Sequence, residues 1–439
     1  MRANKTYMFI TFGCQMNERD SETMAGLLAG MGFSESKSRD KADIIIINTC
    51  SVRENADNRF FGTLGQIKSI KQSRPELVVG VCGCMMQQQH LVDTVKEKYP
   101  WVDIVFGTHN IHELPKLVES VISEKRKRVA IYEEAGEIVE GLPAKRLYPF
   151  KAFVNIMYGC NNFCTYCVVP YTRGRERSRE AENILEEVRS LAAGGAKEIT
   201  LLGQNVNSYK GPKGTGFVEL VYMIAETDGV ERIRFMTSHP KDLSGGLIEA
   251  FSRCGKLCGH IHLPVQAGSD RVLERMNRKY TKADYLSLLE RLRESQPDIA
   301  VTTDIIVGFP GETEEDFEDT LDLAKKAEFD SAFTFLYSAR EGAPAAKFED
   351  FVPEEVKHKR FSRLVDVLNE ISFEKNKAYV DRVEKVLVEG PSKTNKKTYS
   401  GRTDSFKLVN FQSDADHTGE IVDVKITDSK TFSLFGEKI

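Results

Sequence analysis

The sequence predicts an α/β protein in three parts: an N-terminal doubly wound parallel sheet, a central partial (βα)6 barrel and a C-terminal small antiparallel β-barrel. Unbroken apolar runs rich in β-branched residues, with helix-like patterns between them, begin the chain. Strand and helix patterns then alternate through the central half, and short alternating segments separated by turn residues end the chain. We place the three parts at residues 4–122, 146–375 and 376–439, with a charged, polar hinge between the first two.

The composition is that of an ordinary globular protein. The chain has 439 residues, of which 41% are hydrophobic, and its net charge is −4, so any nucleic-acid-binding surface must be local. No apolar run approaches the roughly 20 residues that span a bilayer, and no secretory signal peptide is recognisable. Nine cysteines in such a chain indicate a reducing compartment and cysteines used for metal. We therefore expect a cytoplasmic protein that does not contact a membrane.

In the first part, a cysteine follows each of the first three predicted strands. The strands expected here are 7–13, 43–49, 77–83 and 102–106, and the helices are 20–30, 54–69 and 112–122. Because ligands bind at the carboxyl ends of the strands in open α/β sheets, we expect Cys14, Cys50 and Cys84 at one rim. There they would hold an iron–sulfur cluster with one open iron. Three unrelated buried cysteines are the alternative, and we interpret Cys82 as a packing residue.

The central part begins with three more cysteines at a C-x3-C-x2-C spacing, Cys160, Cys164 and Cys167. Three thiolates leave one corner of a cubane cluster without a protein ligand, so a substrate can bind the open iron. A zinc site is the alternative. Zinc usually requires a fourth Cys or His close by, and none follows within roughly thirty residues.

Six βα units are expected after the hinge. The strands are 152–157, 198–202, 232–236, 260–263, 300–307 and 331–336, and the helices between them are 180–193, 217–226, 247–252, 282–294 and 314–327. Nearly every strand end carries a polar residue, which predicts a lined ligand pocket. These residues are Gln204, Asn205, Thr237, Ser238, His239, Gln266, Asp304 and Tyr337. Cys254 and Cys258 lack a third partner nearby, so we interpret them as packing residues.

The segment 159–167 resembles the cluster loop of the radical S-adenosylmethionine (SAM) enzymes. The segments 13–22, 48–54 and 83–84 closely resemble the N-terminal domain of the methylthiotransferases, which are two-cluster members of these enzymes. The resemblance covers nearly the whole chain. It implies two 4Fe-4S clusters, one on Cys14, Cys50 and Cys84 and the other on Cys160, Cys164 and Cys167, together with SAM. It implies no catalytic side chain beyond the two clusters. The residues it suggests around SAM are Tyr166, Gln204, Ser238, Gln266 and Asp304.

A loop just after the second set of cysteines is expected to contact RNA. Four arginines, Arg173, Arg175, Arg177 and Arg179, alternate there with small or polar residues, and the first three are the expected RNA contacts. Arginine pairs with phosphate and stacks on bases, and this loop lies beside the predicted chemistry. A salt-bridged surface loop is the alternative.

The C-terminal part is expected to be a second RNA contact. Its predicted strands are 383–388, 399–402, 407–411, 419–427 and 431–435. Arg402 and Lys407 interleave with aromatic residues there, as base stacking and phosphate contact require. The segment 401–403 resembles the signature of the TRAM domain, an RNA-binding barrel found in this family.

Within the family, the segments that follow Cys14, Cys50 and Cys167 are similar to the branch that acts on N6-isopentenyladenosine at tRNA position 37, beside the anticodon. The resemblance implies that one SAM methylates a sulfur held on the N-terminal cluster. A second SAM, cleaved at the central cluster, yields a radical that removes the adenine C2 hydrogen, and the methylthio group is added there. The nearest alternative is a methylthiotransferase acting on threonylcarbamoyladenosine or on a ribosomal-protein aspartate; a further one is a non-enzymatic iron–sulfur RNA binder or redox sensor. The expected partners are the tRNA anticodon stem-loop and a low-potential electron donor such as flavodoxin, and we expect a monomer.

Overall fold

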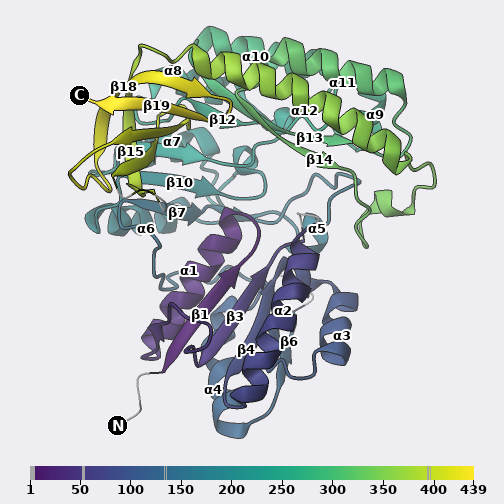
Figure 1. Ribbon diagram of the computed structural model, residues 1–439, viewed down its shortest axis with the longest axis vertical. Coiled ribbons are helices and arrows are strands. Elements are labelled where there is room, and N and C mark those ends of the chain that lie inside the picture. The colour runs from purple at the N-terminus through teal and green to yellow at the C-terminus, as the bar shows by residue number, and fades with distance from the viewer. Residues whose placement is uncertain (1–4, 52–54, 133, 135, 393–394, 396) are drawn as a thin grey trace.

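The computed structural model describes residues 5–439 apart from 52–54, 133, 135, 393–394 and 396; the side chains of 55–57 are also not described. The expected domain start at residue 4 and the motif residues 52–54 lie outside the described residues. Figure 1 shows the N-terminal part as a separate lobe below the central part, with the C-terminal barrel packed on one side of the central part. The junction of the N-terminal lobe with the central part and the junction of the central part with the C-terminal barrel both bear on the candidate site.

The N-terminal part is a parallel sheet with helices on both faces, as the sequence predicts. The strand order is β2-β1-β3-β4-β5-β6. The strands are β1 Thr6–Thr11, β2 Ser34–Glu35, β3 Ile44–Thr49, β4 Val78–Gly83, β5 Ile104–Phe106 and β6 Arg128–Ala130, and the helices are α1 Gln15–Gly30, α2 Asn55–Ser73, α3 Gln89–Lys98 and α4 Leu114–Glu124. Helices α2 and α3 pack on one face of the sheet, and α1 and α4 pack on the other. Every residue of β3 and β4 is buried, because apolar side chains alternate between the two covered faces.

Two elements of this lobe differ from the expectation. Strand β6 lies beyond residue 122 and pairs with β5, so the sheet extends further than the predicted domain end. The charged segment 124–128 leads into this short edge strand. Helix α3 was not predicted, because its apolar positions at Val92 and Val95 are too few to give a clear period.

The central part is an open barrel of six parallel strands that follow one another in chain order. Two three-stranded sheets, β7-β10-β11 and β12-β13-β14, are joined by a parallel bridge between Ile233 and Leu257. The strands are β7 Lys151–Asn155, β10 Glu198–Leu202, β11 Arg232–Phe235, β12 His260–His262, β13 Ala300–Val307 and β14 Ser331–Leu336, with a short antiparallel pair β8 Met157–Tyr158 and β9 Arg177–Ser178 after β7. This arrangement confirms the predicted partial barrel.

Helices cover the outer face of this barrel. They are α6 Ala181–Ala193, α7 Phe217–Ala225, α8 Gly245–Arg253, α10 Lys282–Ser295, α11 Glu314–Ala327 and α12 Glu354–Lys377, with shorter α5 Val169–Thr172 and α9 Asp270–Arg275 near the strand ends. Side chains of all six long helices join one hydrophobic core with the strands. Helix α12 was not predicted. It packs against β14 and α11 through Leu364 and Leu368, and its exposed faces are densely charged.

The C-terminal part is a closed five-stranded barrel in the order β15-β16-β17-β19-β18. The strands are β15 Val383–Pro391, β16 Thr398–Arg402, β17 Leu408–Gln412, β18 Ile421–Lys430 and β19 Ser433–Lys438. Four of the neighbouring pairs are antiparallel, as expected, but β17 and β19 are parallel. The chain therefore crosses from β17 to β18 before it returns, which local patterning does not reveal.

Helix α1 joins the N-terminal lobe to the central part. Arg19 donates to Glu187 of α6 at 2.7 Å, and the Lys145 N–H of the hinge donates to the Glu22 carbonyl oxygen at 2.9 Å. A Cβ at Gly26 would lie 2.6 Å from the backbone of Pro143, so only glycine allows the hinge to pack this closely on α1. The same helix begins next to Cys14, so this junction also positions the N-terminal cysteines.

Candidate functional site

Cys160, Cys164 and Cys167 lie on the loop between β8 and α5, at the carboxyl end of the barrel strands. The Cys167 N–H donates to the Cys164 carbonyl oxygen at 3.0 Å, which folds the last two cysteines into a tight turn. Gly159 has φ +76°, and a Cβ there would lie 2.1 Å from the facing backbone. The side-chain amide of Asn277 donates to two carbonyl oxygens of the loop, at 3.2 and 3.0 Å. These contacts fix the loop with its three sulfurs on one side of the barrel mouth.

Arg278 supports this loop from the barrel side. It is 7% exposed, and its Nη1 lies 3.5 Å from the Cys164 sulfur and 3.4 Å from the hydroxyl oxygen of Tyr166. Its Nη2 donates to the Pro264 carbonyl oxygen at 2.7 Å. Burial raises the pKa of the Cys167 thiol to about 12, so this thiol does not ionise by itself at neutral pH. Coordination to a metal deprotonates such a thiol.

The N-terminal cysteines gather around Asn17, one turn into α1. The Asn17 Oδ1 lies 3.9 Å from the sulfurs of both Cys14 and Cys84. Its amide nitrogen donates to the carbonyl oxygen of Thr49, the residue before Cys50, at 2.7 Å. Gly13 has φ +119°, and a Cβ there would lie 2.9 Å from the Cys50 sulfur. The ends of β1, β3 and β4 therefore bring the three cysteines to one rim, as the strand topology predicts.

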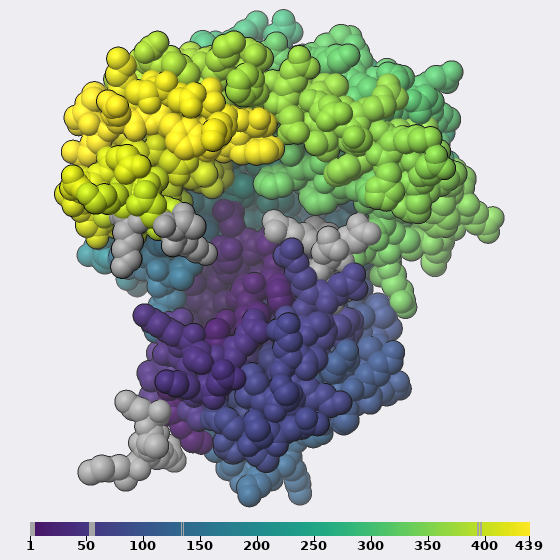
Figure 2. Space-filling view, viewed as in Figure 1, coloured from purple at the N-terminus to yellow at the C-terminus, as the bar shows by residue number. Residues whose placement is uncertain are grey.

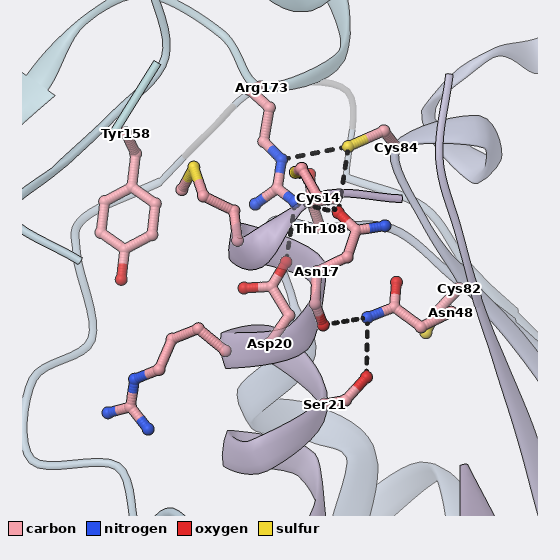
Figure 3. Close-up of polar contacts among 12 residues, drawn as sticks. Cys14, Asn17, Asp20, Ser21, Asn48, Cys82, Cys84, Thr108, Tyr158 and Arg173 are labelled. Atoms are coloured by element: carbon pink, nitrogen blue, oxygen red, sulfur yellow. Dashed lines mark hydrogen bonds and ion pairs between the residues drawn. The ribbon is translucent and has the colours of Figure 1, made fainter. Parts of the chain in front are cut away.

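Arg173 reaches this rim from the central part (Figure 3). Its Nε lies 3.1 Å from the Cys84 sulfur, and its Nη2 donates to Asn17 Oδ1 at 3.0 Å and to Asp20 Oδ2 at 2.7 Å. The residue is only 4% exposed. Because Arg173 follows Cys167 by six residues, one short segment connects the two sets of cysteines.

This burial is at odds with the expected RNA contact of Arg173. Its guanidinium is occupied by a sulfur, an amide and a carboxylate inside the protein. Its two neighbours in the motif are more accessible. Arg175 is exposed and lies over the Phe163 ring at 4.3 Å, and Arg177 is half-buried beside the hinge, where it donates to the Gly136 carbonyl oxygen.

A second contact joins the barrel mouth to the neighbourhood of the N-terminal cysteines. The side-chain amide of Gln204, at the end of β10, touches the sulfur of Met16, which lies two residues after Cys14. Figure 2 shows that the molecular outline narrows at the junction of the lobes. Arg173 and Gln204 thus cross this junction from the central part at two points, and both meet residues next to the N-terminal cysteines.

The residues suggested around SAM lie at the barrel mouth. Ser238 and Gln204 follow β11 and β10, and both have a buried side-chain oxygen, Oγ and Oε1, without a hydrogen-bond partner among the described residues. The Gln266 N–H donates to the Asp304 carbonyl oxygen at 2.9 Å, so these two residues are neighbours. Tyr166, in the cysteine loop, packs against the barrel core beside Arg278. Unpartnered buried oxygens at strand ends fit a site for a polar ligand.

Four of the eight described non-glycine residues with positive φ lie near the same mouth. Phe163, Thr237, Gln266 and Asn277 all have positive φ, at 48°, 68°, 74° and 60°. Non-glycine residues rarely adopt this conformation, and they do so most often where function requires a particular geometry. Phe163 lies within the cysteine loop, Asn277 donates to that loop, and Thr237 and Gln266 follow barrel strands.

The C-terminal residues expected to contact RNA instead face the central barrel. Lys407 is buried and pairs with Asp330 at 2.8 Å, and Arg402 donates to the Phe406 carbonyl oxygen at 3.1 Å. The Phe406 ring stacks on His260 of β12 with centroids 5.0 Å apart. These basic and aromatic residues therefore contribute to a domain interface.

Four residues of the site were not identified from the sequence: Asn17, Asp20, Asn277 and Arg278. Asn17 and Asp20 follow Cys14 by three and six residues, so a helix starting at Cys14 would have placed them on its cysteine side. Asn277 and Arg278 lie more than a hundred residues from the loop that they support, and no local pattern indicates them. Cys82 lies 3.8 Å from the Met24 sulfur in the core of the N-terminal lobe, and Cys254 and Cys258 are buried in the central part, which fits their interpretation as packing residues.

The donor set fits iron–sulfur clusters better than single ions. All nine cysteines are described, and none forms a disulfide. Among the described residues, no group of three or more His, Cys, Asp or Glu side chains has the geometry to hold one metal ion. Two sets of three thiols, each beside a buried arginine, suit a larger inorganic group with thiolate ligands at separate corners.

In the described part of the chain, no helix has the length and apolarity needed to cross a bilayer.

Comparison with known families divides the chain as the structure does. The Radical SAM superfamily matches residues 154–324, the Uncharacterized protein family UPF0004 matches 6–107, and the TRAM domain matches 377–439. These matches cover, respectively, most of the barrel, most of the N-terminal lobe and the C-terminal barrel.

The chain is similar over its full length to curated bacterial enzymes. It is 55% identical to the tRNA-2-methylthio-N(6)-dimethylallyladenosine synthase of Alkaliphilus oremlandii, covering 99% of this chain and 93% of the relative. It is 54% identical to the enzyme of the same name from Clostridium tetani, covering 99% and 96%. Among solved structures, the radical SAM methyltransferase TsrM from Kitasatospora setae has a TM-score of 0.56 at 16% identity, covering 78% of this chain and 77% of TsrM. This likeness shows a shared fold.

Proposed function

The chain belongs to the family of the tRNA-2-methylthio-N(6)-dimethylallyladenosine synthases, and we propose that it adds a methylthio group to C2 of N6-dimethylallyladenosine at position 37 of tRNA. The observation that carries this proposal is the similarity at 55% identity, which runs through both sets of cysteines in one chain. The alternative substrates, threonylcarbamoyladenosine and a ribosomal-protein aspartate, are not favoured, because the full-length relatives carry the dimethylallyladenosine name.

Two sets of residues would hold the inorganic groups. Cys160, Cys164 and Cys167 would hold one 4Fe-4S cluster, and Cys14, Cys50 and Cys84 would hold a second. A cluster with three cysteine ligands supplies an open iron, which can chelate SAM for reductive cleavage or carry the sulfur to be transferred. Two observations support the fit of these residues to the clusters and SAM. The cysteines are free of disulfides, and the Gln204 and Ser238 side-chain oxygens at the barrel mouth have no hydrogen-bond partner among the described residues.

The protein's own residues have positioning roles in this proposal. Gln204 and Ser238 offer the side-chain oxygens that can orient the polar groups of SAM, while Gln266 and Asp304 line the adjacent strand ends. Arg173 and Arg278 each place a positive charge beside one sulfur, which offsets the negative charge of a thiolate-bound cluster. No His, Ser or carboxylate is assigned to proton transfer, since an adenine C2–H is too weakly acidic for side-chain bases.

The proposed partners follow from the family membership and from the accessible basic residues. The tRNA anticodon stem-loop would approach the junction of the lobes, where Arg175 and Arg177 are the accessible members of their motif. The C-terminal barrel belongs to a domain type named TRAM, and its remaining surface would add an RNA contact away from the barrel interface. We propose a monomeric cytoplasmic protein that takes electrons from a low-potential donor such as flavodoxin.

Mass spectrometry of tRNA nucleosides tests the proposed function. A host strain lacking its own enzyme should contain N6-dimethylallyladenosine without the 2-methylthio form. Expression of this chain should restore the 2-methylthio nucleoside, and the Cys160→Ala variant should not. If the wild-type chain leaves the nucleoside profile unchanged while it carries both clusters, the proposed substrate is wrong.

A further inference from the structure

Two phenylalanines project from the inner face of the barrel and are unusually exposed. Phe333 and Phe335 of β14 have exposed fractions of 54% and 36%. Side chains of β14 alternate between two faces, and α12 packs on the outer one, as Figure 1 shows. Phenylalanines on the opposite face are therefore directed into the barrel, where large apolar side chains normally fill space.

The neighbouring strand continues this apolar surface. In the register of β13 with β14, Ile306 pairs with Phe335 and Asp304 pairs with Phe333. Ile306 is partly exposed, whereas Ile305 and Val307, on the other face of β13, are buried against the helices. The inner face thus has an apolar surface made of Ile306, Phe333 and Phe335, and it lies next to Asp304.

A polar row borders the apolar surface. His262 Nδ1 lies 3.0 Å from Thr302 Oγ1, its Nε2 lies 3.5 Å from Asp304 Oδ1, and its ring meets the Phe333 ring edge-on with centroids 6.2 Å apart. At the bottom of the barrel, Phe406 of the C-terminal part stacks on His260. Phe406 therefore fills the barrel interior at the amino ends of the strands, while the apolar surface nearer the carboxyl ends remains uncovered.

We propose that Ile306, Phe333 and Phe335 bind the dimethylallyl group of the substrate adenosine. This inference rests on the proposed function. Of the groups that would meet at the barrel mouth, SAM carries charges and the clusters carry thiolates, and the dimethylallyl chain is the one branch made only of hydrocarbon. The uncovered apolar surface spans β14 and the neighbouring β13, which carries the candidate SAM residue Asp304. It would therefore hold this chain while the adenine ring faces the reacting groups.

The proposal is tested by RNA discrimination with the intact, cluster-loaded protein. Two synthetic anticodon stem-loops are compared, one with N6-dimethylallyladenosine and one with adenosine at the target position. We expect the wild type to bind the dimethylallylated RNA more tightly and to modify it with a higher kcat/KM. The Phe333→Ala/Phe335→Ala variant should lose on the order of tenfold or more of this preference, because apolar pockets discriminate by the hydrocarbon that they bury. The milder Phe333→Leu variant should lose less.

Phe373→Ala is the matched control, since this phenylalanine is 39% exposed on α12, outside the barrel, and its loss should leave the preference unchanged. Iron content and melting temperature check that each variant is folded. The inference fails if the double variant keeps the wild-type preference. It also fails if RNA-independent SAM cleavage falls as much as RNA modification, because the surface would then bind SAM. A wild type that is inactive on both RNAs would instead refute the proposed function.

Discussion

The guanidinium of Arg173 lies 3.1 Å from the Cys84 sulfur, although the two residues belong to different lobes. Arg278 has a corresponding position beside Cys164, at 3.5 Å. Each set of three cysteines therefore has one buried arginine next to one of its sulfurs. Hydrogen bonds and positive charge at a cluster sulfur favour the reduced, more negative state.

We predict that Arg173→Met makes the reduction potential of the proposed N-terminal cluster more negative. The loss of a positive charge and a hydrogen bond at Cys84 disfavours the added electron. The potential is measured by an electron paramagnetic resonance titration in a Cys160→Ala background, where only this cluster remains. Arg173→Lys should give an intermediate value, because it keeps the charge and loses the fixed geometry.

Arg179→Met is a suitable control for this experiment. Arg179 is also buried, and it pairs with Glu140 and with Glu187 at 2.7 Å. Its loss should destabilise the fold by about 3–5 kcal/mol, as the loss of a buried ion-pair partner does, without moving the potential. Equal potentials in the wild type and Arg173→Met would contradict the proposed role of Arg173.

Iron analysis after anaerobic reconstitution tests the two sets of cysteines separately. The wild type should bind about eight irons per chain, and Cys14→Ala and Cys160→Ala should each lose about half. Cys258→Ala, which removes a buried packing cysteine of the central part, should keep the full content. A variant of either set that loses all the iron would indicate one shared cluster, and the two-cluster proposal would be wrong.

Much of this site could be predicted, because the order of the parallel strands determines which residues meet at their carboxyl ends. Cys14, Cys50 and Cys84 follow three parallel strands, so their convergence depends only on the sheet order. Gln204 and Ser238 follow from the same rule at the barrel mouth. The burial of Arg173 could not be predicted, because its sequence neighbours indicate a basic surface loop, whereas its burial depends on how the two lobes dock. The burial of Lys407 could not be predicted for a similar reason, since a basic and aromatic segment suits a protein interface as well as RNA.

The contact between the C-terminal barrel and the central part depends on Arg234. Its guanidinium donates to Glu198 at 2.8 Å and to the carbonyl oxygens of Thr403 and Asp404 at 2.6 and 2.7 Å. Arg234→Ala should lower the free energy of unfolding by about 3 kcal/mol or more, because Glu198 is left buried without this partner. Denaturant unfolding measures the loss, and limited proteolysis should cut faster near residues 378–382. The exposed Lys397→Ala control, which breaks the surface pair with Asp414, should show no measurable change.

Glu312 should make stability depend on pH. Burial raises the pKa of its carboxyl to about 7, although the Gly308 N–H and Arg360, at 2.9 Å, oppose this shift. A folded pKa above the unfolded value of 4.5 means that the folded state holds the proton more tightly. The stabilisation is complete below pH 4.5 and is lost as the pH rises through about 7. Relative to Glu312→Gln, the wild type should lose at most about 3 kcal/mol over this range, because one pKa unit corresponds to about 1.4 kcal/mol.

Chemical denaturation of both proteins at pH ~5 and pH ~8 checks this difference, since the two values lie on either side of most of the titration. Glu355→Gln provides the control, because Glu355 is exposed at the start of α12 and its surface pair with Lys359 gives little stability at any pH. If the wild type and Glu312→Gln keep a constant difference in unfolding free energy, Glu312 is ionised throughout. The Arg360 ion pair would then outweigh burial, and the segment 308–312 would be held by charge attraction and not by a protonated carboxyl.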